Sequence, residues 1–351
     1  MTDIAFFPNY FAPIKLASPP PTPRPCIDLL SDYEFLKVVG RGGYGKVLLA
    51  RNKSDDQLVA VKVIERTKIS SNGWLRVERE RNVLIGNSRF PFLVSLRAYL
   101  DTEQRTFLMM DFASGGDFLS HLIRMGGRLD EQGVRFYSAE ITCALGYLHS
   151  MGVLHRDLKL ENILLDKYGH ILLTDFGFCR QGITATEQTG TFLGSHGYMA
   201  PEIMLGRMYG RSVDWWSFGV IVYTMAFGLF PYGLTDDMLA DPTAVCEALT
   251  EDRLTFDVSI GVSQYLVDFV RQLLHLNAEA RLGSSQIDAE DVKMHRFYWD
   301  ISWDDVEFKN YVPPFCPVEM LSGEEDVRFF DCTFTEQCVD KDEFTDFAYT
   351  G

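Results

Sequence analysis

One eight-residue stretch gathers the side chains that phosphoryl transfer needs. It reads His-Arg-Asp-Leu-Lys-Leu-Glu-Asn and places Asp157, Lys159 and Asn162 within six positions. A second carboxylate, Asp175, follows the apolar run 171–173 and opens an Asp-Phe-Gly triplet. In phosphoryl transfer from a nucleotide, one carboxylate orients the attacking hydroxyl, an ammonium steadies the phosphate, and an amide and another carboxylate hold magnesium. Each residue alone would be an ordinary surface polar group, but their order indicates this chemistry.

A glycine-rich stretch and a lysine give a second signal. Residues 35–39 are a predicted strand, and residues 40–47, Gly-Arg-Gly-Gly-Tyr-Gly-Lys-Val, are a predicted turn into another strand. Because no helix follows directly, a dinucleotide-binding loop is disfavoured. Lys62 lies inside the apolar strand 59–63, and a buried lysine needs an anionic partner. Nucleotide phosphates and Glu80, on a helix predicted from about residue 74 to 85, are both available.

The segment between these two sets predicts a connection between two lobes. Residues 108–110 are a predicted buried strand, with Met110 at the back of an adenine pocket and residues 111–113 offering backbone hydrogen bonds. Asp117 stands at a predicted helix start, where a carboxylate is favourable as a cap. This capping role is compatible with a contact between Asp117 and the ribose of a nucleotide. A long predicted helix from Glu131 to His149 then leads into the catalytic stretch.

The region after Asp-Phe-Gly carries a candidate regulatory site and structural acids. A loop rich in Gly, Thr and Gln leads to Thr191, which precedes an Ala-Pro-Glu triplet. A single loop threonine is usually just exposed, but this position makes Thr191 a candidate for activating phosphorylation. Asp214 precedes a predicted buried helix, so we expect it to bind backbone amides and brace the catalytic stretch. Arg281 is the predicted partner of a buried Glu202.

Composition indicates a soluble globular enzyme with two lobes or domains and flanking segments. The 351 residues are 46% hydrophobic and 23% charged. No apolar run is long enough to span a bilayer, and no secretory signal stands at the N-terminus. The seven cysteines form no Cys-x-x-Cys pair, which favours reduced thiols and a cytoplasmic or nuclear location.

The charge balance limits the choice of partners. The net charge of −16 argues against nucleic acid or an anionic membrane as the main partner. Residues 298–351 hold fourteen Asp and Glu against three Lys and Arg. An acidic surface suits recognition of basic peptides, although a surface that is merely solvated has the same composition.

The two ends of the chain differ from the middle. Residues 1–32 form a Pro-rich segment that is predicted to be extended and unpacked. Four aromatic residues near its start could form a docking patch, but the favoured interpretation is that they have no specific role: Phe6, Phe7, Tyr10 and Phe11. Past Tyr298 the helical periodicity ends, and aromatic residues interspersed among acids suggest a strap that wraps the domain.

With these residues in place, the chain from about residue 33 to 351 resembles the AGC group of Ser/Thr protein kinases, and within it the ribosomal-protein kinase and RSK-like branch. The resemblance rests on the glycine-rich stretch, on Asp-Phe-Gly-Phe-Cys-Arg and on Ser-Val-Asp-Trp-Trp-Ser-Phe-Gly-Val. It implies an α+β fold with a small five-stranded antiparallel lobe bearing one helix and a larger, mostly helical lobe. The kinase domain would span 33–297 and a C-terminal extension 298–351, with ATP in the cleft and Ser or Thr hydroxyls of proteins as acceptors.

The resemblance also assigns roles to individual residues. The catalytic residues are Asp157 as base, Lys159 beside the γ-phosphate and Lys62 at the α/β-phosphates. The magnesium ligands are Asn162 and Asp175. The residues placed around the nucleotide are Gly40, Arg41, Gly42, Gly43, Tyr44, Gly45, Val47, Ala60, Lys62, Glu80, Met110, Asp111, Ala113, Asp117, Glu161, Leu164, Thr174 and Phe330.

Several positions depart from the family pattern. Asp117 stands where basophilic members often have Glu, and Thr224 where some have a second substrate-reading acid, whereas Glu161 is retained. We therefore expect a preference for Arg three residues upstream of the target, but not two residues upstream. Ser195 replaces the usual Thr and keeps the hydroxyl that bonds the catalytic Asp. Gly197 replaces a common Glu on the peptide side.

Regulation is expected to centre on Thr191. The resemblance implies an upstream activating kinase, and three cations could receive the phosphate on Thr191: Arg76, Arg156 and Arg180. In the strap, the hydrophobic motif 344–349 has Ala348 at the usual phosphoacceptor position, and Lys341 falls near the other one. We expect this motif to dock without phosphorylation.

Two other functions compete with an active protein kinase. A pseudokinase or scaffold would bind partners through the same fold, but such proteins usually lack one of the Lys, Asp, Asn or Asp-Phe-Gly positions, all of which stand here. A small-molecule kinase is disfavoured because the Ala-Pro-Glu segment and the Thr191 loop serve peptide binding. We expect a monomeric enzyme that acts on proteins with upstream basic residues.

Overall fold

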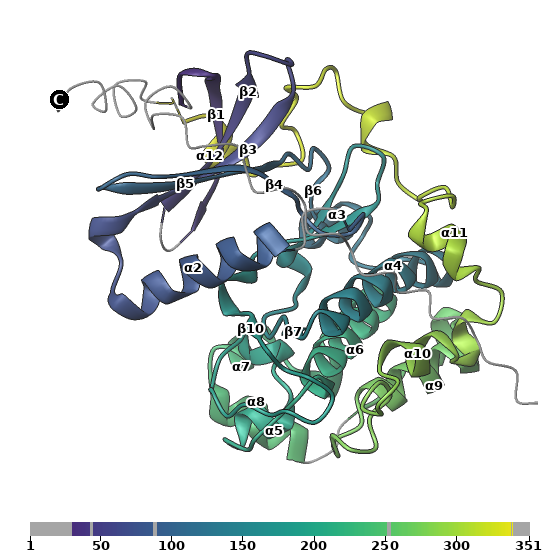
Figure 1. Cartoon of the computed structure of the whole chain (residues 1–351). Helices are drawn as coiled ribbons and strands as arrows, with labels where there is room; N and C mark the ends of the chain where they lie inside the picture. Colours follow the sequence, from purple (N-terminus) through teal and green to yellow (C-terminus); the bar gives the residue numbers. More distant parts are fainter. Residues whose placement is uncertain (1–29, 43–44, 87–89, 251–253, 338, 340–351) are drawn as a thin grey trace, which may run out of the picture.

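The computed structural model describes residues 30–42, 45–86, 90–250, 254–337 and 339. Two lobes stack on one another, with the sheet of the smaller lobe above the helices of the larger one (Figure 1). The α+β architecture expected from the resemblance is therefore confirmed. The N-terminal aromatic cluster, Gly43, Tyr44 and the hydrophobic motif 344–349 lie outside the described residues.

The smaller lobe is one antiparallel sheet of five strands with the order β1-β2-β3-β5-β4. Its elements are β1 Tyr33–Gly42, β2 Gly45–Asn52, β3 Leu58–Glu65, β4 Leu96–Asp101 and β5 Arg105–Asp111, with helix α2 Ser71–Gly86. On β3, buried residues alternate with partly exposed ones from Leu58 to Val63, because one sheet face packs on the lobe core. This sheet positions Lys62 on β3, and α2 carries Glu80 toward it.

The glycine-rich stretch is more regular than its sequence predicted. Residues 40–47 were expected to form a turn, but β1 continues through Gly42 and β2 begins at Gly45, which pair with each other. The ladder extends this far because Gly45 lets β2 lie close to β3. A Cβ at position 45 would stand 1.8 Å from the carbonyl oxygen of Val63.

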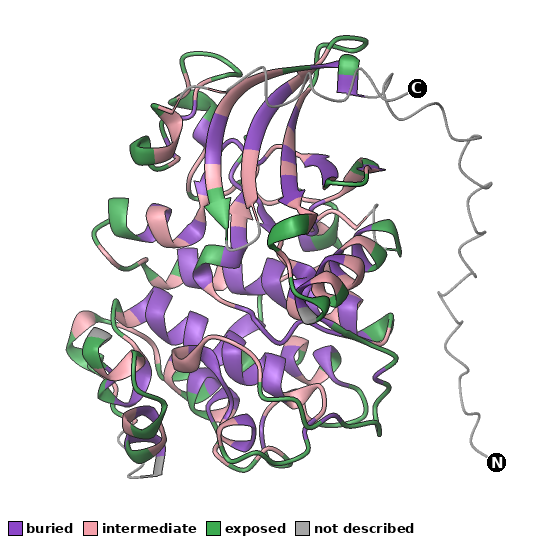
Figure 2. Cartoon of the chain, turned by 90° about the vertical axis from the view of Figure 1, so that its left-hand side faces the viewer, coloured by how far each residue is buried: buried purple, intermediate pink, exposed green. Residues whose placement is uncertain are grey.

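The larger lobe is built around two buried helices. Its helices are α3 Phe118–Arg124, α4 Glu131–Ser150, α5 Pro201–Met204, α6 Ser212–Phe227, α7 Asp236–Leu239, α8 Pro242–Thr250, α9 Gln264–Leu273 and α10 Ala289–Lys293. Helix α6 is buried from Val213 to Ala226, as expected for a helix that is apolar on every face. Buried residues, purple in Figure 2, concentrate in the interior, whereas the outer loops are mostly exposed.

Short strands beneath the sheet hold the catalytic stretch. They form two small antiparallel sheets, β6-β8-β9 and β7-β10. Their bounds are β6 Gly116–Asp117, β7 Val153–Leu154, β8 Ile163–Leu165, β9 Ile171–Leu173 and β10 Arg180–Gln181. The catalytic stretch therefore runs between β7 and β8, and the Asp-Phe-Gly triplet is separated from the end of β9 by one residue.

The segment after residue 298 runs as a strap along both lobes, as its aromatic pattern predicted (Figure 1). Its described residues include the short helices α11 Trp303–Glu307 and α12 Cys332–Thr335 and a 3₁₀ turn, Pro317–Glu319. Lys309 pairs with Asp166 of the larger lobe, and Glu325 pairs with Arg51 of the smaller lobe. The strap thus connects the two lobes that must enclose a nucleotide.

Candidate active site

The predicted catalytic residues converge in one place. The Oγ of Ser195 donates a 2.9 Å hydrogen bond to Asp157, and the Nζ of Lys159 donates one of 3.2 Å to Ser195. The same ammonium lies 3.7 Å from the carboxylate of Asp157. A serine hydroxyl therefore joins the predicted base to the predicted phosphate contact. The hydrogen bond expected between Ser195 and Asp157 is therefore present.

The main chain around these residues is strained. Among the described residues, six other than glycine have positive φ, and two of them are Arg156 at 65° and Asp175 at 59°. Such conformations cost free energy and persist only where the surroundings hold them. At Arg156 it is Asp214 that does so, because its two carboxylate oxygens accept 2.8 Å hydrogen bonds from the backbone N–H groups of His155 and Arg156. The bracing role expected of Asp214 is confirmed.

Asp214 is itself held by a buried imidazole that the sequence reasoning missed. Nε2 of His149 lies 2.9 Å from Asp214, and Nδ1 lies 3.0 Å from Asp288. Since carboxylates only accept hydrogen bonds, both ring nitrogens must carry protons. Burial alone would lower the pKa of His149, but Asp288 and Asp214 raise it to about 9. Nothing in the sequence signals Asp288, which stands far away along the chain.

Lys62, the lysine predicted to bind phosphate, has the predicted anionic partner. Nζ of Lys62 lies 2.6 Å and 2.8 Å from the two carboxylate oxygens of Glu80, and 3.8 Å from Asp175. Glu80 is buried, so this pair meets the need of a half-buried ammonium for an anion. The pair also fixes α2 against the sheet, and Phe176 packs edge-on to His155 below it. Both lobes therefore contribute to one preformed site.

The two predicted magnesium ligands fit that ion. The side-chain nitrogen of Asn162 donates to Asp157, which leaves its amide oxygen as the group able to bind a cation. Burial would raise the pKa of Asp175, but Lys62 and the Gly177 N–H outweigh it and the net shift is downward, so this carboxylate is ionised. Magnesium favours a few oxygen ligands and keeps waters and phosphates. Within the described residues, no group of three or more His, Cys, Asp or Glu forms a closed metal cage.

The predicted adenine pocket is assembled from both lobes. Ala60 on β3 pairs in register with Met110 on β5, and Leu164 lies on β8 of the larger lobe. On the strap, Phe330 stacks on Phe112 with ring centroids 5.4 Å apart. Phe330 also packs in the cluster that contains Val47. These apolar groups can enclose a planar base between the lobes.

Other predicted nucleotide contacts are partly occupied by internal bonds. The N–H of Asp111 donates to the carbonyl of Ser95, so this residue could serve adenine only through its carbonyl oxygen. Asp117 caps α3, accepting from both the N–H and the hydroxyl of Ser120. The N–H of Thr174 donates to the Asn162 carbonyl. Glu161 is exposed. Ala113 is buried, and it ends the segment that connects the two lobes.

Two cationic side chains contact the residues just before the loop that carries Thr191. Arg156 donates hydrogen bonds to the carbonyl oxygens of Phe178 and Cys179, and the guanidinium of Arg76 lies 4.4 Å from the centre of the Phe178 ring. Burial lowers the pKa of Arg79, and three like-charged guanidinium groups lower it further, namely those of Arg156, Arg180 and Arg76. Thr191 is exposed, and its carbonyl oxygen accepts a 2.6 Å hydrogen bond from Tyr209, which in turn contacts Arg156. Arg79 was missed from the sequence. Its spacing of three from Arg76 on a helix would have placed both on one face.

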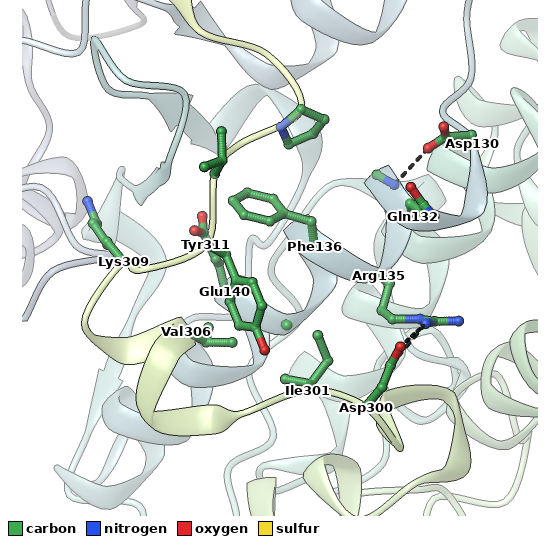
Figure 3. A pocket seen from close by; sticks show the side chains of 14 residues that line it. Asp130, Gln132, Arg135, Phe136, Glu140, Asp300, Ile301, Val306, Lys309 and Tyr311 are labelled. Carbon is green, nitrogen blue, oxygen red and sulfur yellow. Dashed lines mark hydrogen bonds and ion pairs between the residues drawn. The ribbon is translucent and has the colours of Figure 1, made fainter.

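A separate cavity lies away from these residues. It has a volume of about 410 Å³ and lies between the start of α4 and the strap around α11 (Figure 3). Phe136, Tyr311 and Val306 line it, and Arg135 pairs with Asp300 at its edge. None of the predicted catalytic, magnesium or nucleotide residues lines this cavity.

Comparison with known proteins settles the family. The protein kinase domain family matches residues 33–297. The chain belongs to the protein kinase family. Serine/threonine-protein kinase Sgk2 of Rattus norvegicus is 42% identical to this kinase over 312 residues, 89% of this chain and 82% of the relative. Serine/threonine-protein kinase Sgk1 of Danio rerio is 39% identical over 338 residues, 92% and 74% of the two chains.

These similarities confirm that the protein is an AGC-group protein-serine/threonine kinase that uses ATP. Serine/threonine-protein kinase Sgk3 of Rattus norvegicus is 40% identical to this kinase over 316 residues, 88% of this chain and 60% of the relative. Within the described residues of this kinase, no helix is both long and apolar enough to cross a membrane.

Proposed function

We propose that this kinase transfers the γ-phosphate of magnesium-bound ATP to Ser or Thr in proteins that carry Arg three residues upstream. The observation that carries the proposal is the joined set of Asp157, Ser195 and Lys159, with the Lys62–Glu80 pair closed above it. Asp157 would accept the proton of the substrate hydroxyl while Lys159 neutralises charge on the transferred phosphate. Magnesium, held by Asn162 and Asp175, would neutralise the other phosphate oxygens.

The preference for a basic substrate is supported by Glu161. Its carboxylate is exposed, and it stands two residues after Lys159, within reach of a peptide bound at Asp157. A charge-assisted Arg–carboxylate pair contributes about 1.5–3 kcal/mol, which corresponds to roughly 10- to 150-fold in kcat/KM. The acidic net charge of −16 adds a favourable field for basic peptides.

A positional peptide array with labelled ATP tests the reaction and its preference. Arg three residues upstream should raise phosphorylation at least tenfold over Ala, and Glu161→Gln should remove most of that gain. Glu336→Gln, an exposed acid on the strap, is the matched control and should leave the gain intact. An array without any upstream Arg preference would contradict the substrate assignment, and no phosphate transfer at all would favour the scaffold alternative.

The proposed switch is phosphorylation of Thr191 by an upstream kinase. The gathered charges of Arg76, Arg79, Arg156 and Arg180 favour a dianionic phosphate, which would join α2 to the catalytic stretch through charge-assisted bonds. Thr191→Ala should lower activity at least tenfold, and phosphatase treatment should do the same to the wild type.

The matched control for this switch is Thr186→Ala, which removes an exposed hydroxyl from the same loop. Full activity of Thr191→Ala, or equal loss in the two variants, would reject Thr191 as the switch. We further propose that the enzyme acts as a monomer in the cytoplasm or nucleus, in keeping with its unpaired described cysteines.

A further inference from the structure

Gly197 is a glycine for reasons of packing. It lies in the short turn His196–Tyr198, and its φ is not positive, so its backbone conformation admits any residue. A Cβ built at this position would stand 2.5 Å from Cδ2 of Leu239 and 3.1 Å from Cε1 of Phe230. A side chain at 197 and the present position of Leu239 are therefore mutually exclusive.

The side chains around Gly197 form a continuous apolar surface, defined here as the 197 patch: Gly197, Tyr198, Phe230 and Leu239. The rings of Tyr198 and Phe230 pack edge to face with centroids 5.3 Å apart. Phe230 and Leu239 are half-buried, so each keeps part of its surface open. Leu229, next to Phe230 in the chain, is 68% exposed.

The 197 patch borders the site where the peptide must bind. Ser195 bonds both Asp157 and Lys159, and Gly197 is two residues further on, at most about 7.6 Å between Cα atoms. Burial raises the pKa of Tyr198 and the charge of Glu161 raises it further, whereas a hydrogen bond with the backbone of Leu160 lowers it. Because Leu160 directly precedes Glu161, this hydrogen bond holds the Tyr198 side chain against the part of the catalytic stretch that carries the carboxylate proposed to bind Arg. A peptide that reaches from Asp157 past Glu161 therefore passes over or beside the patch.

We propose that the 197 patch is a subsite that takes a large apolar side chain of the substrate, within about five residues upstream of the phosphoacceptor and beside the Arg bound by Glu161. This inference rests on the proposed function and deepens it. Burying a Leu or Phe side chain of the substrate against the 197 patch removes apolar surface from water and therefore strengthens binding. An Arg side chain placed there would lose its hydration and find no anionic partner, so it would bind less well. The favoured substrates would thus combine one basic residue with one large apolar residue.

The test uses the full-length enzyme phosphorylated on Thr191 and serine peptides with Arg fixed three residues upstream. Leu, Phe, Ala and Arg are compared at each other upstream position by kcat/KM. At one position, Leu or Phe should exceed both Ala and Arg by about tenfold. Leu239→Ala should reduce the Leu-to-Ala ratio at that position toward one. Ile287→Ala, an exposed apolar residue elsewhere in the larger lobe, is the matched control and should preserve the ratio.

A coupled variant sharpens the result. Removing Leu239 makes room for a side chain at 197, so the double variant Gly197→Glu/Leu239→Ala should reverse the preference from Leu to Arg at the same position. Three outcomes would overturn the subsite: Ala or Arg equal to Leu at every upstream position, an unchanged ratio in Leu239→Ala, or no reversal in a folded double variant. The same peptide with Ala three residues upstream separates this result from the proposed function. If the enzyme still prefers Arg over Ala at that position, the proposed function stands. If that preference is also absent, the proposed function is contradicted.

Discussion

Replacing Ser195 by alanine tests how Asp157, the proposed catalytic base, is held. The hydroxyl of Ser195 makes the shortest side-chain contact to Asp157, at 2.9 Å, compared with 3.2 Å from Asn162 and 3.7 Å from Lys159. Alanine removes this contact and the bond that Lys159 donates to the same hydroxyl. The carboxylate and the ammonium would then lose their common anchor, although Asn162 would still hold Asp157.

The size of the effect follows from the charges involved. A hydrogen bond to a charged group contributes about 1.5–3 kcal/mol, and each 1.36 kcal/mol corresponds to tenfold in rate. Ser195→Ala should therefore lower kcat roughly 10- to 150-fold. The KM for ATP should change much less than kcat, because the predicted adenine contacts, Lys62 and the predicted magnesium ligands do not bond Ser195, and Lys159 loses only one hydrogen bond to it. A loss confined to kcat is the mark of an interaction needed at the transition state.

The assay is steady-state phosphorylation of a basic serine peptide by enzyme phosphorylated on Thr191. Ser195→Thr keeps the hydroxyl at a half-buried position and is the matched control, expected within about threefold of the wild type. Thermal unfolding of all three proteins would show that the fold is kept. A kcat for Ser195→Ala within twofold of the wild type would refute the idea that this hydroxyl positions the base.

Four further outcomes follow from the structure. Arg281→Met should lower the free energy of unfolding by about 3–5 kcal/mol in urea denaturation, since it leaves Glu202 buried without its bidentate partner; a loss below 1 kcal/mol would contradict this. The pKa of His149 rises on folding to about 9, so its contribution to stability is complete below about pH 6.5 and is lost as the pH rises through 9; His149→Gln should flatten the unfolding free energy over this range. Asp175→Asn should abolish turnover and raise the magnesium concentration needed for ATP binding, whereas unaltered magnesium dependence would remove it as a ligand. Phe330→Ala should raise the KM for ATP about tenfold with little change in kcat, and an unchanged KM would place the strap ring outside the pocket.

Local pattern predicted most of the elements that hold the site. The strand with Lys62, the helix with Glu80 and the buried helix that starts near Asp214 each follow from residues adjacent in the chain. Hydrophobic periodicity reports such elements because burial acts on every turn or alternate residue. The glycine-rich stretch was predicted less well, because pairing of Gly42 with Gly45 depends on how closely β2 approaches β3.

By itself, the sequence determined the chemistry of this kinase: which carboxylates, amide and ammonium are present, and in which order. Only the tertiary structure decided how they are held, because the partners come from distant parts of the chain. Asp288 reaches the catalytic stretch through His149, and Arg79 joins the cationic cluster near Thr191. Likewise, Gly197 became informative only when Leu239 was found against it. Side-chain contacts between distant residues depend on packing in three dimensions, and a one-dimensional pattern does not encode them residue by residue.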